Sequence, residues 1–461
     1  MNLNFLDFVV VGLYVISLFW IAVRTRGMTS FHEYSVAKRS LTGILIAASL
    51  SATYVGPGYC MGFTGKGFAS GFTFLLFGGA FALQTILVGI FVAPRLNSFE
   101  ECESLGDIFA LKYGRHSQIL AGIVSVGLCI GFSSIMAMVG GSLISSLLEL
   151  PKGVLIAIIT GISALYVLTG GLRASVLTDV LQFSVFAIAV PVLLIFSLIK
   201  SNAGFSDISA EAISLTLSGI NELPSITIFG LLLAFFFGES LIPPYVNRAL
   251  AASTQKHARY GFIWAGFFGL AWFVVVFFLG VIARFILPSS TPPDDVFLSL
   301  ASITLPHGLL GLLITGVIGI VMSSQDSVIN SGSVSLTKDV LLFLRDEKQR
   351  FIASRIGTIA IALVAGLVAF YLPSLIEAIL ICYTIWAPTV VIPLVVALFL
   401  PSNVRRPLAG VLGILFGGSA VIVWSFVLNE PGGIPSLIVG LVSCLIGIAI
   451  GMMVKKIEVI R

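Results

Sequence analysis

Hydroxyl and carboxylate side chains gather in the segment 316–339, which begins as an apolar run and reads "GVIGIVMSSQDSVINSGSVSLTKD". Ser323, Asp326, Ser327 and Asn330 follow the spacing i, i+3, i+4 and i+7, so in a helix they share one face, which Ser324 borders. Hydroxyl, carboxylate and carbonyl oxygens are hard ligands that suit a hard cation. Because most of these groups are neutral, the pattern favours a monovalent ion such as Na⁺ over a tightly held divalent ion.

The composition of the chain indicates that this cluster lies inside a membrane. Hydrophobic residues make up 58% and charged residues 10%, with a mean hydropathy of +1.10, whereas soluble domains carry about 25% charged residues. Apolar runs recur along the whole chain at about the 20 residues that a helix needs to cross a bilayer. The sequence therefore predicts an all-α integral membrane protein in a lipid bilayer, and the net charge of +4 does not suggest a nucleic-acid partner.

We expect about 13 membrane-spanning helices. They lie near residues 5–23, 41–64, 72–94, 118–147, 153–169, 175–199, 225–247, 260–286, 308–335, 353–371, 376–400, 407–428 and 434–454. Lys and Arg accumulate in cytoplasmic loops. With the N-terminus outside and the C-terminus in the cytoplasm, all but Lys66, Lys152, Lys200 and Arg284 of the 25 basic residues lie inside, with Arg248 assigned to an inner loop. This predicts a multi-pass protein of the cell (inner or plasma) membrane.

Two of the expected spans are interrupted by glycine and proline. The second contains "TYVGPGYC" and the seventh contains "FFGESLIPPYV", where proline removes a backbone donor and glycine weakens the helix. The two spans are five apart, so they cross the membrane in opposite directions. Broken helices at corresponding positions of two inverted repeats are typical of a transporter with its site near the membrane midplane.

Three ionisable residues, Asp179, Glu239 and Asp326, fall within expected spans. A charged group in a membrane span costs a few kcal/mol on insertion scales and therefore indicates a functional site. Asp179 lies in "TGGLRASVLTDVLQ", and Asp326 lies in the polar segment described above.

These segments resemble a known family. "TGGLRASVLTDVLQ" and "VMSSQDSVINSGSVSLTKDV" are similar to the two most recognisable segments of the sodium:solute symporter family, and "ESLGDIFALKYG" resembles its loop motif. The resemblance implies the inverted-repeat fold of the leucine transporter, with a 5+5 helix core. It divides one membrane transport domain, 1–461, into an extra N-terminal helix and inner loop (1–40), two five-helix repeats (41–200 and 201–401) and two extra C-terminal helices (402–461).

The resemblance also implies sites for co-transported sodium. The first sodium site would use Ala47, Leu50, Ile320, Ser323 and Ser324. A second site, for sodium or a proton, would use Asp179, Asp326 and Ser327 together with Ser323. Members of the family with a well-described second site have hydroxyls where Asp326 stands. A carboxylate there could strengthen the site, bind a proton or pair with a basic residue.

The expected solute site lies at the two helix breaks. Its candidate residues are Ser51, Thr53, Tyr54, Tyr59, Phe74, Phe77, Phe235, Glu239, Tyr245 and Tyr383. "FTFLLFGG" argues against a sugar, while "SATYVGPGY" resembles choline-type members and its "VGPG" also resembles pantothenate-type ones. Aromatic rings with Glu239 would suit an organic cation. Without the glutamate, the pocket could hold a carboxylate at a helix N-terminus, so amino acids and carboxylates stay open.

The sequence thus predicts a sodium-coupled secondary symporter that imports a small organic solute by alternating access. Proton coupling through Asp326 or Asp179 is the alternative within the same fold. A channel or a sensor would not need paired broken helices. An enzyme would need a nucleophile-base pair or a metal motif such as HExxH, which the sequence lacks.

Overall fold

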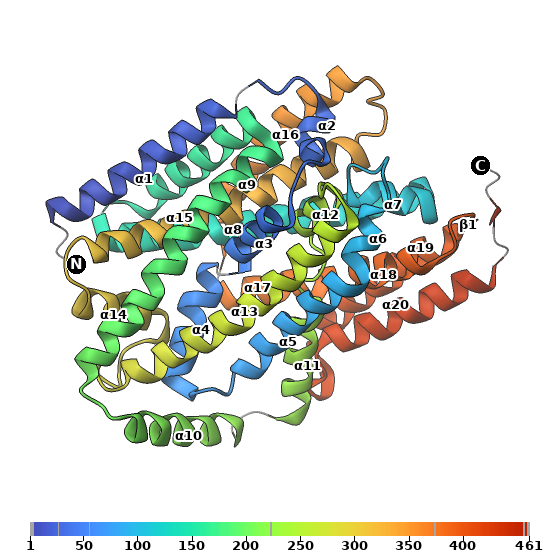
Figure 1. Ribbon diagram of the computed structural model, residues 1–461. Helices are drawn as coiled ribbons and strands as arrows, with labels where there is room; N and C mark the ends of the chain where they lie inside the picture. Colours follow the sequence, from blue (N-terminus) through green and yellow to red (C-terminus); the bar gives the residue numbers. More distant parts are fainter. Residues whose placement is uncertain are drawn as a thin grey trace.

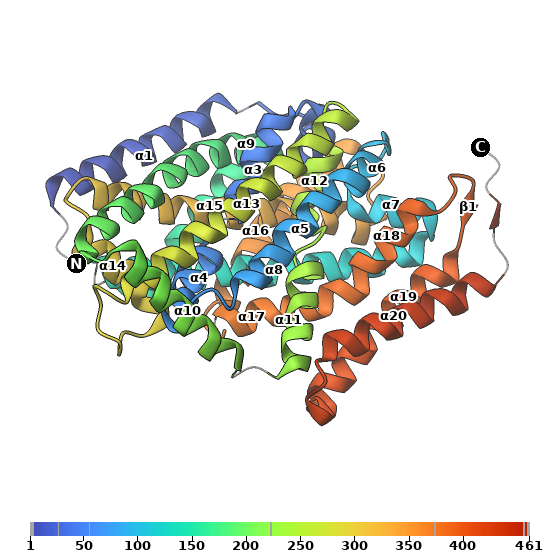
Figure 2. The same cartoon turned by 60° about the horizontal axis from the view of Figure 1, so that its bottom comes forward.

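The computed structural model describes residues 4–25, 27–54, 56–148, 150–221, 224–372, 375–454 and 457–458. Most of its helices run along one common direction, with α1 on one flank and α19 and α20 on the opposite flank (Figures 1 and 2). The α-helices are α1 (Phe5–Arg24), α2 (Phe31–Val36), α3 (Gly43–Tyr54), α4 (Pro57–Ser70), α5 (Leu75–Leu87), α6 (Ala93–Asn97), α7 (Leu105–Lys112), α8 (Arg115–Leu148), α9 (Lys152–Ser201), α10 (Phe205–Asn221), α11 (Ser225–Phe237), α12 (Pro243–Leu250), α13 (Gln255–Ala283), α14 (Val296–Thr304), α15 (Leu309–Ser335), α16 (Glu347–Val368), α17 (Leu375–Trp386), α18 (Ile392–Phe399), α19 (Pro407–Ile422) and α20 (Ser436–Met453).

Short π-helical turns continue several of these helices, and one small sheet is present. The turns are η2 (Val88–Val92), η4 (Leu336–Val340), η5 (Ala387–Val391) and η6 (Val423–Val427); the 3₁₀ turns are η1 (Ala37–Arg39), η3 (Pro293–Asp295) and η7 (Pro431–Gly433). Strands β1 (Val404–Arg405) and β2 (Ile457–Glu458) pair antiparallel, with Val404 opposite Glu458. The all-α prediction is confirmed.

The number of membrane crossings depends on how bent helices are counted. Within the described residues, 9 helices are long and apolar enough to cross a membrane, or up to 11 if each of two bent pairs is one span. At the span predicted near residues 5–23, the structure has a shorter apolar helix, Phe5–Ile21. Helix α9 has 50 residues, where two spans were predicted. The predicted count of 13 therefore stays a prediction. Four of the described helices, α2, α7, α10 and α14, lie outside every predicted span, and α10 lies across one end of the bundle (Figure 1).

Helix α9 changes direction at Gly171, close to the predicted boundary between two spans. Gly171 has φ 50° and ψ −146°, which is open to glycine but strained for other residues. A Cβ there would lie 2.9 Å from the carbonyl oxygen of Tyr34. The glycine therefore permits both the bend and the close approach of α2.

Both predicted helix breaks are present. Helices α3 and α4 meet at a 52° bend, where Gly56 caps α4 and Pro57 occupies its first turn, a position that needs no amide donor. Helix α11 ends at Phe237 and α12 begins at Pro243. Between them, Leu241 has φ 53°, an unfavourable value for a branched residue. The second break is thus held in a strained backbone conformation by its surroundings.

Helix α15, which carries the polar segment, lies in the centre of the bundle. Nearly every residue from Leu310 to Ser335 is buried, including all the polar ones. Polar side chains at this depth must find partners within the protein, because neither water nor lipid can supply them. The helix therefore faces protein on all sides, and its hydroxyls and carboxylate point towards neighbouring helices.

A network at one end of the bundle connects the loop motif to the end of α15. Glu103, just before α7, lies 2.9 Å from His32 Nδ1 and 2.5 Å from Lys338 Nζ. Burial raises the pKa of Glu103, but the charges and hydrogen bonds of Lys338 and His32 together outweigh it, so the pKa lies below its usual value. At Asp107, 3.8 Å from Lys338 Nζ, burial dominates and raises the pKa. The network joins α2, α7 and η4, and its hydrogen bond between Lys338 and Glu103 connects residues 235 positions apart in the sequence.

Close backbone packing of α4 against α13 leads to the first prediction. A Cβ at Gly280 would lie 2.1 Å from the carbonyl oxygen of Thr64 and 2.6 Å from the amide nitrogen of Phe68. Because both are backbone atoms, Gly280→Ala should destabilise the protein by about 1–3 kcal/mol, measured as thermal unfolding of the purified protein in detergent. Gly79→Ala is the control, since no heavy atom lies within 4 Å of the added carbon. Equal unfolding temperatures for the two variants would contradict the packing.

Candidate functional site

A buried ion pair joins the two halves of the chain. Arg248 Nη2 lies 2.8 Å from Asp179 Oδ2, and both side chains are fully buried. Arg248 also donates to Ser327 Oγ at 2.7 Å, to Ser49 Oγ at 2.6 Å and to the carbonyl oxygen of Pro244 at 3.1 Å. The guanidinium thus has partners on α3, α9, α12 and α15. Its assignment to a cytoplasmic loop was wrong: the residue continues the broken seventh span into the interior, where Asp179 compensates its charge.

Asp179 accepts hydrogen bonds from two serines as well as from the arginine. Ser323 Oγ of α15 donates to Oδ1 at 2.5 Å, and Ser49 of α3 donates to Oδ2. One carboxylate therefore holds together the two helices on which the first sodium site was expected. Leu50 and Ile320, two of the expected carbonyl ligands, are buried beside these serines, while Ala47 is half-buried.

Asp326 lies in the same network but, among the described residues, has no ion pair of its own. Ser175 Oγ donates to its Oδ1 at 2.7 Å and Ser327 Oγ donates to the same oxygen at 3.0 Å, while Thr178 Oγ1 lies 3.4 Å from Oδ2. Arg248 reaches Asp326 only through Ser327. One expected alternative was that Asp326 pairs directly with a basic residue. Within the described residues, the structure contains no such pair. Two buried carboxylates share one guanidinium, which leaves the network one negative charge in excess when both are ionised.

Ser323 and Ser324, expected to bind the same ion, point in different directions. Ser323 faces Asp179, whereas Ser324 is directed at the break between α3 and α4, where a Cβ on Gly56 would lie 3.6 Å from its Oγ. Within the described part of the chain Ser324 Oγ is buried without a hydrogen-bond partner. A buried unpaired hydroxyl costs free energy, which a ligand at this position would recover.

A second carboxylate site lies at the break between α11 and α12. Glu239, 3% exposed, accepts hydrogen bonds from Tyr245 at 2.5 Å, from Tyr383 at 2.5 Å and from Tyr59. Tyr59 and Tyr383 also contact each other at 2.5 Å between their hydroxyls. The three tyrosines come from α4, α12 and α17, so the expected solute residues do converge.

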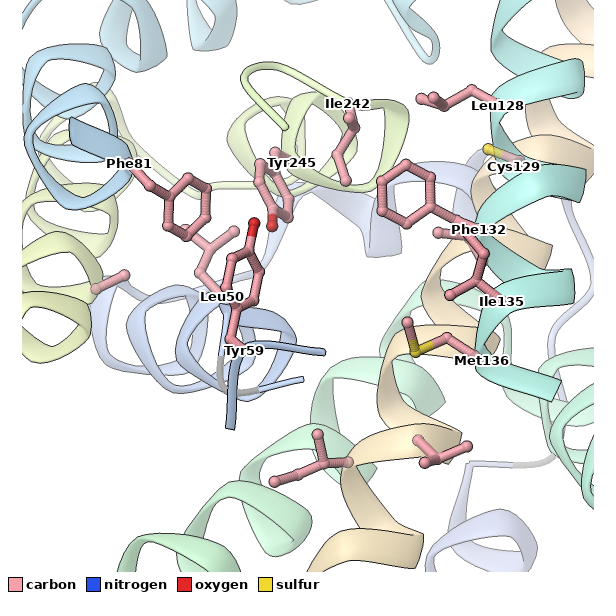
Figure 3. Packing of buried hydrophobic residues seen from close by; sticks show 14 of the residues in the cluster. Leu50, Tyr59, Phe81, Leu128, Cys129, Phe132, Ile135, Met136, Ile242 and Tyr245 are labelled. Carbon is pink, nitrogen blue, oxygen red and sulfur yellow. The ribbon is translucent and has the colours of Figure 1, made fainter. Parts of the chain in front are cut away.

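Glu239 lies on a small cavity, here called the Glu239 cavity, with a volume of about 30 Å³. Its lining includes Thr53, Tyr59, Phe132, Glu239, Ser324 and Tyr383. Figure 3 shows Tyr59 and Tyr245 on one side, facing Phe132 and Met136 of α8 on the other. An adjoining cavity of about 90 Å³, the Lys66 cavity, includes Gly58, Tyr59, Lys66, Phe74, Phe235 and Ile379. The two share Gly58, Tyr59 and Ile379 and so lie next to each other along α4.

The remaining expected residues divide between the cavities and the packing around them. Phe77 is buried and stacks on Phe235 at 5.9 Å between ring centroids, and it lines neither cavity. Ser51 is buried outside the two linings, and the side chain of Tyr54 lies outside the described residues. Phe77 and Ser51 therefore support the site through packing and do not border its space.

Several residues in these sites were not identified from the sequence. They are Ser49, Lys66, Phe132, Met136, Ser175, Thr178 and Arg248. One signal was present for Arg248, which lies four residues after Pro244 and so continues the face of the broken helix. For Phe132 and Met136 the sequence held no signal. The chain has 36 phenylalanines and 8 methionines, and only the tertiary structure shows which of them line a cavity.

Comparison with known proteins gives concordant matches. The sequence model of the sodium:solute symporter family matches residues 34–411. The sodium/pantothenate symporter of Escherichia coli (strain K12) is 26% identical over 485 residues, covering 97% of each chain. A high-affinity proline transporter of Bacillus subtilis (strain 168) is 25% identical over 376 residues, covering 75% of this chain and 76% of its own.

Solved structures agree on the fold. A substrate-bound, outward-open Na⁺-coupled sialic acid symporter superposes with a TM-score of 0.88 at 18% identity, covering 100% of both chains. A nucleobase-cation-symport-1 family transporter in a closed conformation gives 0.57 at 12% identity, covering 91% of this chain and 94% of its own. At these identities the superpositions establish the architecture alone.

The shared guanidinium gives the second prediction. Arg248→Met leaves Asp179 and Asp326 without a counter-charge, so it should lower the free energy of unfolding by about 3–5 kcal/mol. Asp179→Asn in the same chain removes one of the two charges and should restore most of the loss. Thermal unfolding of both variants in detergent measures the difference. Arg115→Met, at an exposed position, should change stability by no more than about 0.5 kcal/mol. If the double variant were as unstable as the single one, the charge argument would fail.

Proposed function

We propose where the ion and the solute bind in this chain, which belongs to the sodium:solute symporter family. As a member of that family it couples the uptake of a small solute to sodium and is not an enzyme. Sodium binds between α3 and α15, and the solute binds at the Glu239 cavity. The observation that carries the proposal is the hydroxyl of Ser324, which borders that cavity while its neighbour Ser323 faces Asp179. Ser323 would thus contact the ion, whereas Ser324 would contact both the ion and the solute.

The first sodium site comprises backbone carbonyls of Ala47, Leu50 and Ile320 with the hydroxyls of Ser323 and Ser324. Five neutral oxygens suit a monovalent cation, and the network's excess negative charge close by would stabilise it. Ser324 has no other hydrogen-bond partner among the described residues, which supports its role as a ligand. Sodium binding would also hold α3 and α15 together, and α3 belongs to a broken helix.

A second sodium ion near Asp179, Asp326 and Ser327 is a further proposal. In the structure the guanidinium of Arg248 donates to Asp179 and Ser327, so it occupies ligands that this ion would need. An ion there would have to displace or share the arginine. Proton coupling through Asp326 or Asp179 is the alternative, in which transport follows pH at fixed sodium. A channel or sensor has less support, since both broken helices are present.

The coupling ratio decides how far the solute can be concentrated. One Na⁺ entering down a potential of about 100 mV supplies about 2.3 kcal/mol, and a tenfold gradient adds about 1.4 kcal/mol. Together these support an accumulation of several hundredfold, which a second ion would square. We propose that import runs by alternating access across the cell (inner or plasma) membrane, with the N-terminus outside, the C-terminus in the cytoplasm and the inverted repeats at 41–200 and 201–401.

The solute classes consistent with the sequence are an organic cation, an amino acid and a carboxylate. The relatives named above carry pantothenate and proline, an acid and an amino acid. The aromatic surroundings of Glu239 support a solute with an apolar body, because Tyr59 packs against Phe63, Phe81 and Phe273. The narrow cavities require that side chains move when the solute enters.

Sodium binding is tested without knowledge of the solute. Sodium at ten times its Kd should raise the free energy of unfolding by about 1.4 kcal/mol, seen as a thermal shift that choline chloride at equal ionic strength does not give. In Ser323→Ala, loss of one hydroxyl ligand worth about 1.5–3 kcal/mol should weaken sodium binding roughly ten- to hundredfold.

Thr315→Ala is the matched control, since its hydroxyl lies on the same helix, is equally buried and donates only to the carbonyl oxygen of Gly311. This variant should keep the sodium response. An unchanged sodium affinity in Ser323→Ala, or equal uptake in sodium-loaded and sodium-free counterflow, would refute the assignment.

A further inference from the structure

Glu239 is a buried carboxyl group beside which the described chain places no basic residue. Three tyrosine hydroxyls contact its two oxygens, and two of them, Tyr59 and Tyr383, also contact each other. Within the described residues no Lys, Arg or His nitrogen lies within 4.0 Å of Glu239. Ionising a buried carboxyl without a counterion is costly, so a cation that enters the cavity would supply the partner that the charged form of Glu239 needs.

The surroundings of Glu239 suit a protonated nitrogen. Ser324 Oγ, 6% exposed and without a partner in the described residues, lines the same cavity and can accept a hydrogen bond. Phe132 and Tyr383, whose ring centroids lie 6.0 Å apart, border the cavity as well. Aromatic faces attract a desolvated cation. Carboxylate, hydroxyl and rings together form a site for an ammonium group.

A basic group without a counter-charge among the described residues lies in the adjoining cavity. Lys66 lines the Lys66 cavity with its Nζ 4.6 Å from the centroid of the Phe74 ring, and no carboxylate among the described residues lies within 4.0 Å of it. Lys66 follows Tyr59 by seven residues, so both lie on one face of α4, about two turns or 10 Å apart along the axis. Under the predicted orientation Lys66 is at the outer end.

We propose that the transported solute is a zwitterion, with its protonated nitrogen against Glu239 and its carboxylate towards Lys66. This rests on the proposed function, in which the Glu239 cavity binds the solute. A simple cation would leave Lys66 without a partner, and a simple anion would leave Glu239 without one, whereas a zwitterion supplies both. Tyr59, which contacts Glu239, lies about 10 Å from Lys66 along α4, and this spacing favours several bonds between the two charges of the solute, as in an ω-amino acid, over the single carbon of an α-amino acid.

Probes of matched length test this on the purified full chain with saturating sodium. 4-Aminobutanoate, 5-aminopentanoate and 6-aminohexanoate are compared with hexylamine, hexanoate and glycine by thermal shift. At least one ω-amino acid should bind ten times or more tightly than the three other compounds. The proposal is overturned if no ω-amino acid binds, or if hexylamine, hexanoate or glycine binds as tightly.

Two variants assign the two charges. Glu239→Gln keeps the shape and should weaken ω-amino acid binding at least tenfold while hexanoate binding is unchanged or stronger. Lys66→Met should weaken it similarly while hexylamine binding is unchanged or stronger. Lys152→Met, an exposed lysine away from both cavities, should bind as the unaltered protein does. Equal losses for all three probe types in either variant would refute two-point recognition.

The sodium response keeps this test separate from the proposed function. Each variant should retain the sodium-induced thermal shift, which also shows that it is folded. If sodium stabilises the protein and ω-amino acids do not, only the solute assignment fails. If Ser323→Ala leaves sodium binding unchanged, the ion assignment fails regardless of the solute.

Discussion

The ion pair between Asp179 and Arg248 is the interaction on which the rest of the site depends. It lies fully buried where α3, α9, α12 and α15 meet, and each of these helices supplies a partner to it. Two charges at this depth persist only because serine hydroxyls and a carbonyl satisfy their remaining hydrogen bonds. Two of the four helices, α3 and α12, belong to broken spans. The pair therefore links the broken spans to the helix that carries the proposed ion ligands.

On the proposed function, helix α15 contributes both to the ion site and to the solute cavity. Its Ser323, Asp326 and Ser327 face the charged network, and Ser324 faces the Glu239 cavity. Because consecutive residues of a helix point about 100° apart, one helix serves both sites without a long-range change. On the proposed function, sodium bound at Ser323 and Ser324 orders the wall of the solute cavity. The binding of ion and solute is then coupled through neighbouring residues of α15.

Much of the architecture could be predicted from the sequence. The two helix breaks appear at "VGPG" and "GESLIPP", because glycine and proline act locally on the backbone. Helix α15 was identified as a polar face within an apolar span, and that face does point into protein. The convergence of Tyr59, Tyr245 and Tyr383 on Glu239 was expected only in outline, as a set of aromatic residues near one carboxylate.

The sequence by itself determined the membrane environment, the helical class and the residues too polar for lipid, since these follow from composition and local backbone chemistry. Only the tertiary structure decided which charges meet. Arg248 was assigned to a loop because an arginine in isolation is expelled from an apolar span, and its burial is stable only when Asp179, 69 residues earlier, lies 2.8 Å away. Pairing of buried charges is a property of distance in space, which the order of residues along the chain does not contain.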